Sequence, residues 1–162
     1  MIALIQRVTR AQVDISGQTV AAIDKGILAL IGIEKDDSSD TGQRLLDRIL
    51  TYRVFPDAAG RMNLDVGQAV GGLLLVPQFT LVADTSKGTR PGFSLAAPPE
   101  VAAAIFEALC AAARARHTPM GAGTFGADMQ VSLTNDGPVT FNLRVAPPIK
   151  PNFPGPGHSL VL

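Results

Sequence analysis

The feature that most constrains the fold is a short apolar run, residues 27–33, which Gly26 introduces. The run is rich in branched residues and too short for a typical helix, so it predicts a buried strand. The stretch before it alternates apolar with polar residues on both sides of Ser16-Gly17. That pattern is typical of two strands joined by a tight turn. The first part of the chain therefore predicts a hairpin followed by a buried strand.

Two helices are predicted. Residues 45–50 carry apolar side chains at helical spacing, and Asp40 with Gln43 three residues later resembles a capping box. The second helix is expected to begin at Pro98-Pro99-Glu100, because proline is favoured in the first turn of a helix.

Further strands are predicted over residues 73–83, 129–133 and 139–145. The first of these would carry Pro77 inside it, which is admissible only at an edge, at an irregularity or at a strand start. Strands interspersed with just two helices predict an α+β domain built on a mostly antiparallel or barrel-like sheet.

The chain divides into a domain and a tail. Residues 1–145 are expected to form one domain, since 162 residues with 46% apolar content suit a single core. Residues 146–162 hold five of the 12 prolines, which is typical of an extended or disordered segment.

Charge and hydropathy limit the partners. Lys plus Arg and Asp plus Glu number 14 each, so no net positive charge attracts nucleic acid to the whole surface. Any RNA contact must be local, and the polar loop 84–97 supplies a basic patch in Lys87 and Arg90. The sequence has no bilayer-length apolar run and no signal peptide, which predicts a cytoplasmic protein without a membrane partner.

Conventional hydrolytic chemistry has few candidates here. The histidines, His117 at a helix end and His158 in the tail, are expected to be structural or incidental, and Cys110 is expected to pack within a helix. No HExxH or CxxC spacing occurs, so neither a metal nor a cofactor is predicted. The glycine-rich stretch 121–126 lacks the spacing of a nucleotide-binding motif. The remaining possibility is catalysis by backbone dipoles, which requires no particular side chain.

Two segments are more specific. Pro77-Gln-Phe-Thr-Leu81 and Asn135-Asp-Gly-Pro-Val-Thr-Phe141 resemble the two signature motifs of D-aminoacyl-tRNA deacylases. The likeness covers about residues 1–145 in collinear order. It implies an ester hydrolase that removes a D-amino acid, or glycine, from the 3′-terminal ribose of tRNA as chiral proofreading in translation. It also implies a homodimer.

The first motif implies the chemistry. The resemblance puts Gln78, Phe79 and Thr80 around the scissile ester, with the backbone N–H groups of Phe79 and Thr80 as oxyanion donors. Thr80 is interpreted as a positioning residue, because no histidine or lysine is evidently placed to activate its hydroxyl. The 2′-hydroxyl of the terminal ribose is expected to assist water or to transfer the proton.

The second motif implies the selectivity. The resemblance implies that the Gly137-Pro138 peptide bond is cis and that this segment reaches into the partner's site. There, two carbonyls would bind the substrate ammonium and leave no room for an L side chain. Without the resemblance, the same residues would be interpreted as an ordinary proline turn. Arg7 is expected to fasten this segment, to which Asn135 belongs. The family likeness also places Phe125 and Met129 beside the terminal adenosine.

One difference from the family's motif leaves the substrate specificity open. The usual deacylase has serine where this chain has Pro77, and a related animal-type deacylase that removes L-alanine from tRNA also has proline there. Phe79 and the Gly-Pro-Val-Thr run keep the chain closer to the D-specific group. The alternatives are therefore the alanine-editing relative and a tRNA-end binding module without catalysis.

Overall fold

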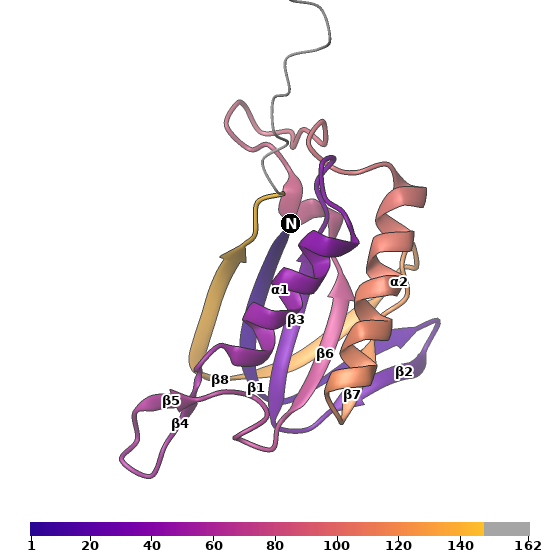
Figure 1. Ribbon diagram of the computed structural model, residues 1–162. Coiled ribbons are helices and arrows are strands. Elements are labelled where there is room, and N and C mark those ends of the chain that lie inside the picture. The colour runs from indigo at the N-terminus through magenta and orange to yellow at the C-terminus, as the bar shows by residue number, and fades with distance from the viewer. Residues whose placement is uncertain (148–162) are drawn as a thin grey trace, which may run out of the picture.

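A computed structural model describes residues 1–147 of the chain. One sheet carries two helices side by side on the same face, and a small hairpin projects from its edge (Figure 1). The helices are α1 (Ser39–Thr51) and α2 (Pro99–Arg116), with a 3₁₀ turn, η1 (Phe79–Val82). The strands are β1 (Ile2–Ile15), β2 (Gln18–Ile23), β3 (Gly26–Gly32), β4 (Phe55–Pro56), β5 (Met62–Leu64), β6 (Gly72–Pro77), β7 (Met120–Ala122) and β8 (Gln130–Arg144).

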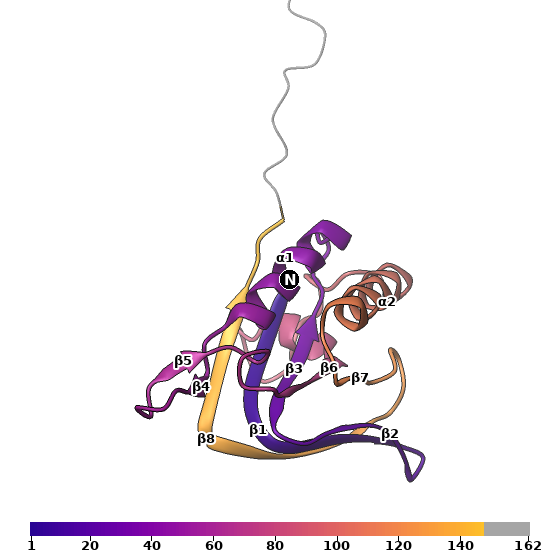
Figure 2. The same ribbon diagram turned by 60° about the horizontal axis from the view of Figure 1, so that its bottom comes forward.

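The long strand β1 organises the sheet, whose order is β2-β1-β3-β6-β7 with β8 on β1. Its three neighbours β2, β3 and β8 are antiparallel to it, whereas β3–β6 and β6–β7 are parallel pairs. Figure 2 shows β1 and β8 curving together towards β2, which approaches β6 and β7. The sheet is thus mixed and nearly closed, and the predicted α+β fold with a barrel-like sheet and two main helices is confirmed.

Strand β3 is buried on both faces, as its apolar run predicts. On the helix side, Ile27 and Ile31 belong to the core that α1 and α2 cover. On the other side, Leu28 packs with Val8 and Leu74 inside the curl of the sheet. Each fully buried aliphatic side chain contributes roughly 1.5–3 kcal/mol of transfer free energy. The central parallel pair β3–β6 is therefore a rigid support for whatever lies at its carboxyl end.

The start of α1 differs from the prediction, whereas the start of α2 agrees with it. The N-cap of α1 is Ser38, in an extended conformation, and its side chain and that of Thr41 form a reciprocal capping box. The predicted box of Asp40 and Gln43 is wrong, because Asp40 already lies in the first turn. In that position its negative charge interacts favourably with the positive N-terminal end of the helix dipole. Helix α2 starts at Pro99, as predicted.

Two strand predictions are corrected. The strand expected over 73–83 ends at Pro77, because the backbone at Gln78 departs from strand geometry and Leu81 N–H bonds back to the Gln78 carbonyl. The two strands expected around residues 135–138 are one strand, β8. Its register places Thr140 opposite Gln6 but Asn135 opposite Val8. Residues 136–139 therefore bulge out of the ladder opposite Arg7.

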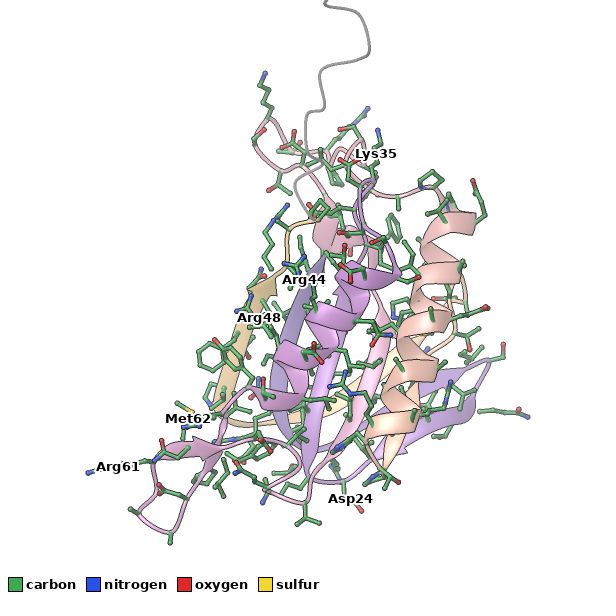
Figure 3. The ribbon with its side chains drawn as sticks, viewed as in Figure 1. Asp24, Lys35, Arg44, Arg48, Arg61 and Met62 are labelled. Carbon is green, nitrogen blue, oxygen red and sulfur yellow. The ribbon has the colours of Figure 1, made fainter. Side chains whose placement is uncertain are left out.

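Polar contacts tie the end of β8 to the rest of the domain. The Met1 ammonium donates to Asp37 Oδ1 at 2.8 Å and to the Val145 carbonyl at 2.9 Å. Arg48, labelled with Arg44 on α1 in Figure 3, donates to the Arg144 carbonyl at 2.8 Å. No helix within residues 1–147 is long and apolar enough to cross a membrane. The predicted tail, 146–162, lies outside the described residues from 148 onward, so its separation from the domain stays a prediction.

Candidate functional site

A cavity of about 720 Å³ opens where the parallel strands β3 and β6 end. Its walls are mainly apolar, and they include the start of α2 and the segment between β7 and β8. Five residues singled out in the sequence line it: Pro77, Gln78, Phe79, Phe125 and Met129. Residues from two segments that are distant in the sequence, 77–79 and 125–129, therefore meet at one cavity.

The local backbone explains how these side chains reach the cavity. Pro77 ends β6, and the tight turn η1 that follows leaves the Phe79 ring 56% exposed at the rim. Just after β7, Gly123 N–H donates to the Leu75 carbonyl of β6 at 2.8 Å. A Cβ on Gly123 would lie 2.7 Å from the sulfur of Met129. Glycine at 123 thus lets Met129 approach the end of β6.

The amide groups at the start of η1 are free to act as donors. Within residues 1–147, the N–H groups of Phe79 and Thr80 donate no hydrogen bond to another residue. They precede the first internal bond of the turn, as the leading N–H groups of any helix do. Two adjacent unpaired N–H groups beside an apolar hollow can stabilise an oxygen that becomes negative.

The hydroxyl of Thr80 has an amide as its neighbour. Gln78 Nε2 donates to Thr80 Oγ1, and no other hydrogen bond to that oxygen occurs within residues 1–147. A carboxamide cannot remove a proton at neutral pH, so this pair orients the hydroxyl and does not activate it. Thr80 itself is exposed beside the cavity and is not part of its lining.

The bulge of β8 forms a second cluster. The Gly137–Pro138 peptide bond is cis, as the resemblance implies. Arg7 Nε lies 3.0 Å from the Asp136 carbonyl oxygen and 3.1 Å from its carboxylate Oδ2. Arg7 Nη1 donates to the Val54 carbonyl at 2.6 Å. Arg7 thus fastens the bulge to the segment before β4.

Asn135 closes the bulge from inside. Its Oδ1 accepts a hydrogen bond from Val139 N–H at 2.9 Å, and its Nδ2 donates to Thr140 Oγ1 at 2.9 Å. Glycine is required at 137, where φ is +133° and a Cβ would lie 2.7 Å from Val139 Cγ2. The bulge is therefore a preorganised, exposed projection.

The two clusters do not meet within one chain. None of Arg7, Asn135, Gly137 and Pro138 lines the cavity. Arg7 bonds to Val54, which adjoins β4, and β4 lies at the lower left of Figure 1, whereas α2, whose first residues line the cavity, begins at the top. A single chain thus presents a cavity at one end and a rigid projection at the other.

The loop 84–97 carries the predicted basic patch. Lys87 and Arg90 are exposed, and reciprocal backbone bonds of 2.7 and 2.9 Å between Asp84 and Gly92 close the loop behind them. Hydrogen bonds from Ser86 to the Asp84 carboxylate hold the pKa of that group below its usual value. Both cations therefore stand on a closed loop that leads directly to the cavity rim.

Sequence reasoning missed Phe93, whose ring lines the cavity 5.0 Å from the Phe79 ring. An aromatic residue inside a polar loop was the available signal. Cys110 packs in the core, as predicted, and its burial raises the pKa of the thiol to about 11. His117 Nε2 lies 2.8 Å from the Gly71 carbonyl, away from the cavity lining. In the described part of the chain, no three His, Cys, Asp or Glu residues cluster as metal ligands would.

The sequence matches the family of D-Tyr-tRNA(Tyr) deacylases over residues 4–144. The chain belongs to this family. A relative from Nitrosococcus oceani named D-aminoacyl-tRNA deacylase is 55% identical, over 93% of this chain and 97% of its own length. One of the same name from Azotobacter vinelandii is 59% identical, over 89% of this chain and 99% of its own. The predicted membership of the deacylase family is confirmed.

Solved structures agree with the deacylase fold. The c-Myc DNA Unwinding Element Binding Protein is 38% identical with a TM-score of 0.85, covering 90% of this chain and 99% of its own. A protein described as a probable eukaryotic D-amino acid tRNA deacylase superposes with a TM-score of 0.75 over 88% of this chain and 98% of its own. At 15% identity, that second likeness shows the fold alone.

Proposed function

We propose that the protein hydrolyses the ester bond between a D-amino acid, or glycine, and the 3′-terminal ribose of tRNA. Membership of the deacylase family supports this activity. The observation that carries it is the pair of unpaired N–H groups at Phe79 and Thr80, beside an apolar cavity with room for a nucleoside. The protein thereby acts as an ester hydrolase that proofreads chirality in translation.

In this mechanism the ester carbonyl oxygen faces the N–H groups of Phe79 and Thr80. Attack by water on the carbonyl carbon gives a tetrahedral intermediate whose oxyanion these dipoles stabilise. The ribose 2′-hydroxyl assists the water or passes the proton to the leaving 3′ oxygen. Thr80, oriented by Gln78, positions the ester and forms no bond to it. The mechanism uses no metal and no cofactor.

Selection of the D form is assigned to Gly137 and Pro138 acting on the cavity of a second copy. The bulge is exposed and held by Arg7 and Asn135, yet it does not line the cavity of its own protomer. A homodimer brings the two clusters together, with the carbonyls of the bulge bound to the substrate ammonium. An L side chain then meets the bulge, whereas glycine passes.

The remaining contacts concern the RNA. Phe125 and Met129 lie beside the terminal adenosine, while Lys87 and Arg90 contact phosphates close to it. A local patch suits a chain of net charge zero, since only the contacted phosphates contribute to affinity. Aminoacyl-tRNA is made and used in the cytoplasm, where we expect the protein to act without a membrane partner.

Alanine editing is not favoured. Pro77 lies in the cavity wall, but relatives that match nearly the whole chain are named for D-aminoacyl substrates. A binding module without catalysis leaves the unpaired N–H groups of Phe79 and Thr80 without a purpose.

The test compares the deacylation of D-tyrosyl-, glycyl-, L-alanyl- and L-tyrosyl-tRNA at equal enzyme concentration. We expect turnover of the first two and spontaneous rates for the last two. Preferential release of L-alanine would assign the protein to the editing relative instead. Binding of all four without any turnover would make it a module for the tRNA end.

A further inference from the structure

Two phenylalanine rings share the rim of the cavity. Phe79 is 56% exposed and Phe93 is 40% exposed, although both are apolar. Their ring centroids are 5.0 Å apart, with the planes tilted by 51°. Exposed aromatic surface gathered at the mouth of a cavity is typical of a binding site, whereas scattered exposed apolar residues need no explanation.

The backbone on both sides of Phe93 is fixed. The preceding residue, Gly92, makes the two reciprocal bonds to Asp84, and the Phe93 carbonyl accepts a hydrogen bond from Ala96 N–H at 3.1 Å. Lys35 N–H, at the top of Figure 3, donates to the Leu95 carbonyl at 3.1 Å. A ring presented by a fixed backbone loses little conformational freedom when a ligand covers it.

We propose that Phe93 forms, with Phe79, the aromatic wall on which the terminal nucleobase of the tRNA stacks. This inference rests on the proposed function, because it names a further residue that binds the same substrate. A nucleobase has two apolar π faces, and stacking on aromatic side chains is the common way to hold a single-stranded base. The adjoining lining, which includes Ala97 and Pro98, is apolar as well.

The position of Phe93 in its loop favours a nucleotide over another apolar ligand. The same closed loop that ends at Phe93 carries the exposed cations Lys87 and Arg90. A loop that offers an aromatic ring at the rim and cations farther out matches a base followed by phosphates. Phe93 is therefore a substrate-binding residue, and it takes no part in the proton transfers of hydrolysis.

The kinetic test replaces Phe93 by alanine, leucine and tyrosine. For D-tyrosyl-tRNA, Phe93→Ala and Phe93→Leu are expected to raise KM about tenfold and to leave kcat within about twofold, since stacking acts mainly on binding. Phe93→Tyr, which keeps the aromatic face, restores the wild-type KM. An unchanged KM in the alanine and leucine variants would overturn the proposal, as would a leucine variant that behaves like wild type.

A spectroscopic test does not depend on catalysis. The chain has no tryptophan, so Phe93→Trp places a single tryptophan at the rim, and its emission can be excited selectively. Adenosine monophosphate and uncharged tRNA are expected to quench its emission in a saturable manner. Met62→Trp is the control, because Met62 is exposed on β5, at the lower left of Figure 3, and does not line the cavity. Its emission should not change.

The outcomes separate this inference from the proposed function. Active enzyme with no quenching at position 93 would overturn the role of Phe93 and leave deacylation standing. Quenching at position 93 without hydrolysis of any aminoacyl-tRNA would support base stacking while the proposed function fails. A change of oligomeric mass in Phe93→Ala, with nucleotide affinity unchanged, would overturn the inference by making the ring a contact between copies.

Discussion

Arg7 holds Asp136 through two oxygens, with its Nε 3.0 Å from the backbone carbonyl and 3.1 Å from the carboxylate. The guanidinium also binds the Val54 carbonyl, so three contacts converge on a side chain that is only 12% exposed. Charge-assisted hydrogen bonds in a partly buried setting are the strong ones. The orientation of the Gly-Pro bulge therefore depends on one residue from the neighbouring strand.

Replacing Arg7 by alanine should misplace the bulge. We expect kcat/KM for D-tyrosyl-tRNA to fall by about tenfold or more, since lost hydrogen bonds to a charged group cost roughly 1.5–3 kcal/mol each. Affinity for uncharged tRNA should be unchanged. Arg10→Ala is the matched control, because Arg10 lies exposed on the same strand and makes no ion pair within residues 1–147. Equal losses in both variants would refute the fastening role.

Thr80→Ala should retain deacylation within about tenfold of the wild-type kcat, because a positioning group is being removed and a nucleophile is not. The measurement is single-turnover hydrolysis of D-tyrosyl-tRNA, with tRNA affinity and urea unfolding as controls.

A substrate ending in 2′-deoxyadenosine should react about a hundredfold more slowly, because the assisting hydroxyl is absent. Complete loss in Thr80→Ala, with a normal deoxy substrate, would restore Thr80 as the nucleophile.

Val70 is strained in a way that a simple substitution should relieve. Its φ is +52°, a left-handed conformation, and the side chain is 87% exposed. A β-branched residue is disfavoured there, whereas glycine adopts this conformation freely. We expect Val70→Gly to raise the free energy of unfolding in urea by about 1 kcal/mol.

The control for Val70 is Val20→Gly. Val20 is also exposed but lies in the regular strand β2, where glycine weakens a strand. That variant should lose stability. A loss of stability in Val70→Gly as well would mean that the backbone at residue 70 is not strained.

Cys110 should make the fold sensitive to alkali. Burial raises the pKa of its thiol to about 11 from an ordinary value of 9.0. Because the folded pKa is the higher one, this contribution to stability is complete below pH 9 and is lost as the pH rises towards 11. Between these values the free energy of unfolding should fall more steeply in the wild type than in Cys110→Ala. Parallel curves would show that the thiol ionises as readily in the fold as out of it.

The elements that the sequence predicted well are those set by local pattern. The apolar run of β3 and the proline start of α2 follow from burial and from backbone geometry at proline. The end of β6 at Pro77 was not predicted, because apolar residues continue from the strand into η1. Only the tertiary contacts of the folded chain mark the boundary between these two elements. The capping box at Ser38 was missed because two overlapping pairs of residues fit similar spacing.

The candidate site divides in the same way. The motif around Gln78 and the Gly-Pro segment were recognisable because each is a run of consecutive residues. Phe93 was not recognisable as a site residue, because only the folded chain brings its ring into contact with Phe79. That Arg7 reaches both Asp136 and Val54 likewise requires the folded chain.

The most direct test of a site shared between two copies mixes two inactive variants. Gly137→Ala is expected to be inactive, because its Cβ would lie 2.7 Å from Val139 Cγ2 and would displace the carbonyls that bind the substrate ammonium. Phe79→Pro removes one of the two unpaired N–H donors beside the cavity and leaves the bulge intact. A mixed dimer then holds one intact cavity facing one intact bulge, provided that Gly137 acts on its partner.

The decisive measurement is the hydrolysis of D-tyrosyl-tRNA by an equimolar mixture of these variants after subunit exchange. Half of the dimers are then mixed and each has one working site, so activity should recover to about a quarter of the wild-type value. Native mass spectrometry of the same mixture verifies that exchange has taken place. Exchange without any recovery of activity would contradict a site built from two copies.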